Sequence, residues 1–271
     1  MGDWKRGLFD GVPDSVYHSR EIGVVSKGAL DRLARSPAHY RAWLDAPPRD
    51  TDAVMFGRAF HCATLEPERF EQIYTVEPDF GDCRKTDNRN ARNEWRAANT
   101  GKRLVDAADF DALRFMGDAI RKHPLAGKML RDGRPESSVF WEDPHTGLKC
   151  RCRPDYYVPD RRMTIDIKSA DDASRNGFRR AISKYRYHVQ DALYREGLAA
   201  VGERVEYFLF VAVEKEPPWA VAIFSLDEQA VERGYAAARD GMTTMARCLR
   251  EGQWPAYETG IQVLDLPAWA A

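Results

Sequence analysis

The stretch that decides the fold runs through residues 163–169, MTIDIKS, and is preceded by residues 153–155, RPD. The period of two in the first stretch predicts a β-strand with Asp166 and Lys168 on one face and the isoleucines on the other. A short turn between the two stretches favours antiparallel strands, which would bring Asp155 close to Asp166. Two carboxylates this close repel each other unless a cation lies between them, so the pattern predicts a divalent metal site beside an ammonium group.

Such a site has the parts that phosphodiester hydrolysis needs. A metal ion polarises a phosphate and lowers the pKa of a bound water, and Lys168 can orient or deprotonate that water or neutralise developing charge. Asp-x-Lys alone is weak evidence, because residues 3–5 contain another example. On a strand it is most often an exposed ion pair worth under ~1 kcal/mol. The flanking isoleucines, which indicate a buried strand, and the upstream Asp155 favour the metal site.

Two helical signals and one basic segment extend the pattern. His61 lies in a helix predicted over residues 52–66. It is either a metal ligand or an ordinary core or surface histidine. Gln190 and Tyr194 share one face of a helix predicted over residues 185–200, where they bind DNA near the metal or form an ordinary polar stripe. Residues 79–103 are rich in Arg and Lys, and this composition predicts a loop followed by a short exposed helix. The segment either contacts DNA or is simply a solvated surface.

Composition excludes several classes of protein. The 271 residues are 44% hydrophobic and 31% charged, which allows a substantial core. A formal net charge of -1 argues against nucleic-acid binding over the whole surface, but it permits a local basic channel. Five cysteines without a regular framework argue against a disulfide-rich secreted domain. No signal-peptide core and no run of ~18 apolar residues is present, so we expect a cytoplasmic protein that does not enter a membrane.

The order of elements predicts a mixed α/β (α+β) fold in a single domain, residues 1–271. Residues 1–130 read as a mainly helical N-terminal part. Residues 131–251 read as the core, with strands over 137–142, 148–158 and 163–169 in an antiparallel meander, then helices, two further strands and a long helix. Residues 252–271 retain Trp254, Tyr257, Leu264, Leu266 and Trp269, so we expect this tail to dock.

Taken in chain order, these residues resemble the PD-(D/E)XK nuclease superfamily in its RecB-like branch. That branch combines a helical histidine, a strand aspartate after Arg-Pro, a strand Asp-x-Lys and a helical Gln-x-x-x-Tyr. The matching residues are His61, Asp155, Asp166 with Lys168, and Gln190 with Tyr194. Segments 26–30, 36–40, 56–61, 185–190, 208–215 and 254–257 resemble the nuclease domain of the RecE-like (exonuclease VIII) family. The resemblance covers nearly the whole chain.

The resemblance implies a restriction-endonuclease-like core with a central mixed sheet flanked by helices. It also implies a Mg²⁺-dependent 5′-to-3′ exonuclease, with Mn²⁺ as an alternative ion, that degrades linear double-stranded DNA and leaves 3′ single-stranded tails for recombination by strand annealing. The implied metal ligands are His61, Asp155, Asp166 and the carbonyl of Ile167. The implied catalytic residues are Asp155, Asp166, Lys168, Gln190 and Tyr194. The DNA contacts expected beside Gln190 and Tyr194 are Arg84, Lys85 and Arg153, and Glu136 is a further candidate as an outer-shell carboxylate.

The expected partners are double-stranded DNA ends, a RecT-like single-strand annealing protein and further copies of the chain in a ring, as a tetramer rather than a trimer. The expected setting is the cytoplasm of a bacterial or phage-infected cell. A ring would let basic residues of segment 79–103 line its bore while the outer surface stays acidic. Three alternatives stay open: a RecB-like nuclease of other polarity or an endonuclease, a non-catalytic DNA-binding homologue, and a purely structural ion-pair cluster of Asp155, Asp166 and Lys168.

Overall fold

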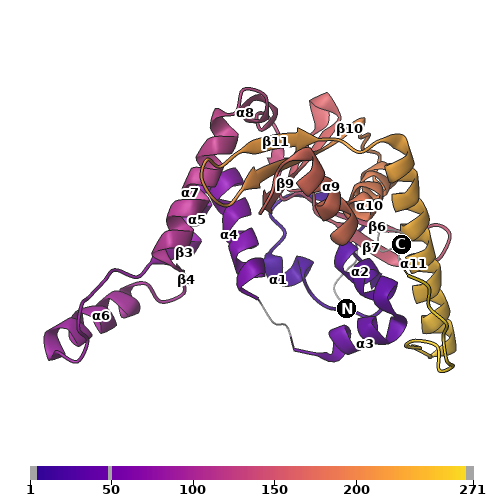
Figure 1. Cartoon of the computed structure of the whole chain (residues 1–271), viewed down its shortest axis with the longest axis horizontal. Helices are drawn as coiled ribbons and strands as arrows, with labels where there is room; N and C mark the ends of the chain where they lie inside the picture. Colours follow the sequence, from indigo (N-terminus) through magenta and orange to yellow (C-terminus); the bar gives the residue numbers. More distant parts are fainter. Residues whose placement is uncertain (1–4, 48–50, 267–271) are drawn as a thin grey trace.

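The computed structural model describes residues 5–47 and 51–266, and its centre is a five-stranded mixed sheet (Figure 1). Its strands, in spatial order, are β11 (Val221–Phe224), β10 (Tyr207–Glu214), β9 (Met163–Ala170), β8 (Tyr156–Val158) and β5 (Arg134–Pro135). The middle strand β9 carries Asp166 and Lys168, as predicted. Helices α9 (Arg175–Lys184) and α10 (Tyr187–Ala200) connect β9 to β10, so these two strands are parallel while the other pairs are antiparallel.

The strand predicted over residues 148–158 is in fact two strands in two sheets, so that prediction is wrong. Its first half, β7 (Lys149–Cys152), pairs with β6 (Ser138–Glu142) in a four-stranded sheet. The edges of that sheet are β1 (Gly7–Phe9) and β2 (Val24–Val25). The break falls at residues 153–155, because Pro154 has no N–H group and cannot donate to a central ladder. Asp155 therefore lies in the link directly before β8.

Helices cover both faces of the five-stranded sheet (Figure 1). On one face Ile165 and Ile167 pack with residues of α4 (Asp52–Leu65) and α7 (Ala107–Lys122). On the other face Phe208 and Phe210 pack with α10, α11 (Glu228–Glu251) and α2 (Lys27–Arg35). The alternation predicted from residues 163–169 is confirmed, since the isoleucines of β9 lie in one core while Asp166 faces α10.

Local capping explains where the N-terminal helices begin. Ser26 accepts a hydrogen bond from the Ala29 amide at the start of α2. Ser36 does the same for the His39 amide at the start of α3 (Pro37–Asp45), where Pro37 takes the first helical position. The short helix α1 (Asp14–Tyr17) precedes them, and no described helix is long and apolar enough to cross a bilayer.

An arm that carries α6 (Thr86–Ala98) projects away from the body of the molecule (Figure 1). Its base is a parallel pair of short strands, β3 (Tyr74–Val76) and β4 (Arg103–Val105), next to α5 (Pro67–Ile73). No residue of α6 is buried, in agreement with the exposed helix predicted in segment 79–103. After α7 the chain forms the short helix α8 (Ala126–Met129) before it enters the central sheet.

The C-terminal tail contacts the body through its aromatic residues. The Trp254 ring lies 5.3 Å from that of Tyr40, and the Tyr257 ring lies 5.6 Å from that of His39. Leu264 and Leu266, which were expected to dock, are 84% and 73% exposed. Trp269 lies outside the described residues.

Candidate active site

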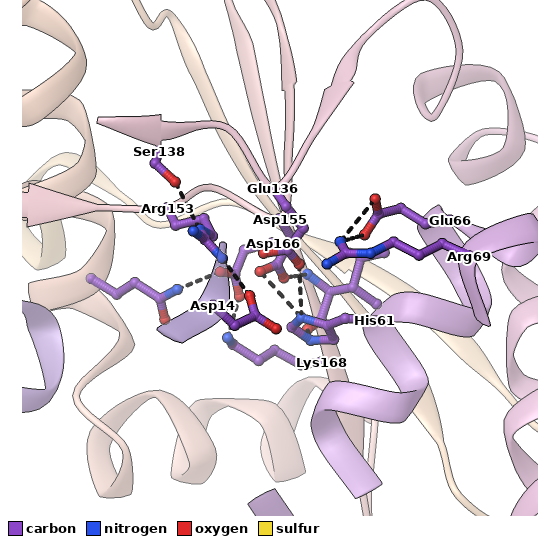
Figure 2. A network of polar contacts seen from close by, with 12 residues as sticks. Asp14, His61, Glu66, Arg69, Glu136, Ser138, Arg153, Asp155, Asp166 and Lys168 are labelled. Carbon is purple, nitrogen blue, oxygen red and sulfur yellow. Dashed lines mark hydrogen bonds and ion pairs between the residues drawn. The ribbon is translucent and has the colours of Figure 1, made fainter. Parts of the chain in front are cut away.

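The predicted residues come together where α4, the link before β8, β9 and α10 meet (Figure 2). His61 arrives from α4, Asp155 from the link, and Asp166 and Lys168 from β9. Gln190 reaches in from α10 and donates a hydrogen bond to Asp166 Oδ2. Residues more than a hundred positions apart in the chain therefore share one site, as the sequence predicts.

His61 of α4 and Asp155 lie next to each other and against the backbone of β9. His61 Nδ1 lies 3.3 Å from Asp155 Oδ1, and its Nε2 lies 3.0 Å from the carbonyl oxygen of Ile167. Asp155 Oδ2 accepts a hydrogen bond of 2.7 Å from the Ile167 amide. The imidazole, the carboxylate and the Ile167 carbonyl thus face one another, and all three are possible metal ligands.

Glu136 completes a group that could hold a metal ion. One ligand atom from each of His61, Glu136 and Asp155 lies within 4.8 Å of the other two, and no further such group occurs among the described residues. Glu136 directly follows β5, and its φ of 51° is unusual for a residue with a side chain. Strained backbone of this kind concentrates at functional sites. The sequence pointed to this residue only as an outer-shell candidate.

Asp166 lies deeper, against Lys168 rather than within that group. The Asp166 side chain is fully buried and forms an ion pair between Oδ1 and Lys168 Nζ. Its other oxygen accepts the hydrogen bond from Gln190. Gln190 therefore fixes the orientation of Asp166, in addition to any contact with a substrate.

Burial and mutual repulsion shape the charges of the site. Burial, followed by the neighbouring Asp155 charge, raises the pKa of Asp166 to about 6. Burial also raises the pKa of Asp155. Burial opposes protonation of His61, but the Asp155 and Glu136 carboxylates outweigh it and raise its pKa to about 9. Burial likewise opposes the charge on Lys168, yet Asp166 and Asp155 hold its pKa above the usual value. The site therefore attracts positive charge strongly.

These shifts predict how stability depends on pH. A group with a raised pKa stabilises the folded state below its unfolded pKa, and this contribution is lost as pH rises through the folded value. For Asp166 that window runs from 3.8 to about 6, and for His61 from 6.5 to about 9. With EDTA present, we expect the melting temperature to fall as the pH rises through each window, because the stabilising contribution of that residue is then lost. Because a divalent cation competes with the protons, any gain in melting temperature on adding one should grow with pH. Thermal unfolding at several pH values, with EDTA and with a divalent cation, measures both effects. An equal gain at pH 6.5 and 9 would contradict the placement of a metal ion beside Asp166 and His61.

A cavity of about 530 Å³ opens onto the site. Gln190 and Tyr194 line this cavity, as predicted for residues that face the site. Its lining also contains four acidic residues, namely Asp14, Glu66, Glu136 and Asp155. The Lys and Arg residues of the lining number eight, namely Lys27, Arg32, Arg58, Arg69, Arg103, Arg151, Arg153 and Lys168. The excess of cations makes the cavity suited to a polyanion although the whole chain has a net charge of -1.

Arg153 is tied into the protein as well as facing this cavity (Figure 2). Its guanidinium donates to Ser138 Oγ at 2.9 Å, to Asp14 Oδ1 at 2.7 Å and to the Val12 carbonyl at 2.8 Å. It also lies 4.0 Å from the centre of the Tyr17 ring. Arg153 thus anchors the N-terminal segment, and its contact with DNA stays a prediction.

Two predicted DNA contacts are not brought to the site. Arg84 and Lys85 lie in the arm before α6, and the Arg84 side chain is 95% exposed. Two residues that the sequence marked only within the segments resembling RecE-like enzymes, and gave no role, also lie at the site. Lys27 lines the cavity, and Tyr187 places its ring 4.9 Å from Lys168 Nζ. The helical spacing of Tyr187 to Gln190 and Tyr194 could have assigned it to the site, whereas Lys27 has no signal beyond its place in segment 26–30.

Comparison with known proteins identifies the family and the fold. A crystal structure from Eubacterium rectale, named as a candidate exonuclease, superposes with a TM-score of 0.62 at 14% identity over 94% of this chain and 95% of that one. A phage-related exonuclease from Haemophilus somnus 129PT covers 84% of this chain and 96% of its own at 14% identity, with a TM-score of 0.36. No curated protein matches. The family profile described as a PDDEXK-like domain of unknown function (DUF3799) matches residues 26–267. The chain belongs to this family of PDDEXK-like domains and has the PD-(D/E)XK nuclease fold.

Proposed function

We propose that this chain is a Mg²⁺-dependent 5′-to-3′ exonuclease that degrades linear double-stranded DNA and leaves 3′ single-stranded tails. The observation that carries the proposal is the convergence of His61, Asp155, Asp166 and Lys168 beside a cavity rich in cations. Polarity and substrate come from the resemblance of the motifs to RecE-like enzymes.

The donor set fits a hard divalent ion. The candidate ligands are His61 and the oxygens of Glu136 and Asp155, with Asp166 and the Ile167 carbonyl next to them. Oxygen-rich sets of this kind suit Mg²⁺, and Mn²⁺ tolerates the additional imidazole nitrogen. When bound, the ion would polarise the scissile phosphate and lower the pKa of a bound water.

The chain's own residues have separate tasks around that ion. Lys168 is a cation in this site, so its ammonium orients the attacking water and stabilises the charge that develops on the phosphate. Gln190 holds Asp166 in a single orientation through its amide N–H. Tyr194, which lies on the same face of α10, borders the cavity where the DNA strand would enter.

The arm offers a second contact with DNA. Arg84, Lys85 and Arg89 lie on or next to α6, away from the site, where they could follow the duplex that has not yet been digested. Neutralising all three as Gln should lower processivity and reduce the slope of log K against log[salt] by up to about 3, at ~0.9 per lost phosphate contact. Binding to duplex DNA at several salt concentrations measures the slope.

The matched control for the arm is the neutralisation of Arg233, Arg247 and Arg250 on α11, on the opposite side of the molecule (Figure 1). These residues are also exposed, so the control removes the same charge from a different surface. Equal losses in the two triple variants would indicate a general effect of net charge rather than contact by the arm.

Assembly and partners follow from the same resemblance. We propose a ring of identical subunits around DNA, with four copies favoured over three, and cooperation with a RecT-like single-strand annealing protein. Analytical ultracentrifugation of the purified chain, with and without DNA, measures the number of subunits.

The test of the function is digestion of duplex DNA labelled at its 5′ ends, with a covalently closed circle of the same sequence as the control. Loss of the linear DNA alone, from its 5′ ends and only with Mg²⁺, is the expected result. Cutting of the circle would support an endonuclease instead. Tight DNA binding without cleavage under any divalent ion would support a non-catalytic binding protein.

A further inference from the structure

One face of α10 carries three residues that all lie toward the site. Tyr187, Gln190 and Tyr194 occupy positions i, i+3 and i+7, which share one side of a helix. Gln190 contacts Asp166, and two residues further along β9 the Lys168 ammonium lies 4.9 Å from the centre of the Tyr187 ring. At this distance a cation is attracted by the face of an aromatic ring. The helix therefore contacts both charged side chains of the Asp-x-Lys pair.

The Tyr187 ring is held firmly in place. It stacks on Phe210 of β10, with ring centres 5.6 Å apart and planes 24° apart. Tyr185 lies at the same distance and angle, and Phe178 of α9 lies 5.8 Å away. These aromatic contacts fix the position of the Tyr187 ring.

Residues of helix α2 make hydrogen bonds and ion pairs with the turn that precedes Tyr187. Arg186 has a φ of 53° and donates to the Leu30 carbonyl at 3.0 Å and to Asp31 Oδ1 at 3.3 Å. Lys27 donates to the Tyr185 carbonyl at 2.6 Å and pairs with Asp31. A left-handed conformation at an arginine persists only where the surroundings enforce it. These contacts set where α10 begins and hence where Tyr187 points.

Lys168 is placed so that it needs such support. Its side chain lines the cavity at the metal-binding group and also a second cavity of about 760 Å³, which Tyr187 lines as well. A lysine has a flexible four-carbon stem, so without a ring beside it the ammonium could turn toward either space. The Lys168 ammonium pairs with Asp166 on one side. On its other side it faces the Tyr187 ring, which limits its movement.

We propose that Tyr187 is a positioning residue, whose ring face holds the Lys168 ammonium in the orientation that the reaction needs. The proposal rests on the proposed nuclease function, to which it adds a residue outside the Gln-x-x-x-Tyr pair. Tyr187 acts through Lys168 and does not itself touch the metal-binding group.

The test compares Tyr187→Leu with Tyr187→Phe, which keeps the ring and removes only the hydroxyl. Loss of a cation–π contact predicts a kcat roughly 5- to 30-fold lower for Tyr187→Leu, with KM for DNA and Mg²⁺ affinity within about twofold of wild type. Tyr187→Phe should retain kcat within about twofold, since the aromatic face is unchanged. Equal losses in both variants, or no loss in Tyr187→Leu, would overturn the proposal.

A second readout does not depend on activity. In protein with ¹³C-labelled lysine, the Lys168 ε-methylene signal, assigned with Lys168→Arg, should show a ring-current shift in wild type and Tyr187→Phe and lose it in Tyr187→Leu. If Tyr187→Leu does not fold, the absence of that shift in wild type would still overturn the proposal. An inactive wild type that shows the shift would reject the proposed nuclease function and leave the pairing of ring and ammonium supported.

Discussion

Replacing Asp166 with Asn should lower the rate of DNA digestion by roughly 10³-fold or more, because it removes a charge at the centre of the reaction. The side chain is fully buried and pairs with Lys168. Asn keeps the shape and can still contact Gln190, so the change removes the charge and little else. Initial rates on end-labelled linear DNA at saturating Mg²⁺ measure the loss.

The control for this variant is Asp171→Asn, three residues after Lys168. The Asp171 side chain is 87% exposed and pairs with Lys215 on the surface, so its loss should leave the rate within about twofold of wild type. Circular dichroism of Asp166→Asn should match wild type. If Asp166→Asn changes the melting temperature while digestion proceeds at the wild-type rate, the acidic cluster is a structural ion-pair network and the proposed active site is wrong.

The core of the site was predictable because it depends on local periodicity. The period of two in residues 163–169 predicts which side chains of β9 share a face, and the structure confirms it. The helix that carries Gln190 and Tyr194 was predicted for the same reason. The resemblance to known nucleases then joined these local patterns into one site. Periodicity alone could not show that α4 would bring His61 against the Ile167 carbonyl.

The parts that the sequence analysis missed or placed only in an outer shell depend on contacts between distant segments. Glu136 enters the metal-binding group because a two-residue strand, β5, pairs with β8 and a left-handed turn follows it. So short a strand leaves almost no pattern in a sequence. The split of the strand predicted over residues 148–158 could have been read from Pro154, which a central ladder excludes. That break is what frees the Asp155 carboxylate to accept from the Ile167 amide.

Replacing Lys168 with Ala should lower kcat by roughly 10²- to 10³-fold, the usual cost of removing one preorganised group that stabilises developing charge. The ammonium forms an ion pair with Asp166, and Asp166 and Asp155 keep its pKa raised, so it is charged throughout the working range of a nuclease. Single-turnover digestion of end-labelled DNA measures the chemical step separately from product release.

Metal binding distinguishes the role of Lys168 from that of Asp166. Removing the Lys168 ammonium removes a positive charge beside the metal-binding group, so Lys168→Ala should bind Mg²⁺ as tightly as wild type or more tightly, while Asp166→Asn should bind it less tightly. Lys168→Arg is the matched control, since it keeps the charge but places it in a planar group, and we expect only partial activity from it. Weaker Mg²⁺ binding in Lys168→Ala, measured by calorimetry, would show that the lysine mainly maintains the shape of the site. Its loss of activity would then be a consequence of a damaged metal site and not of a missing charge on the reacting phosphate.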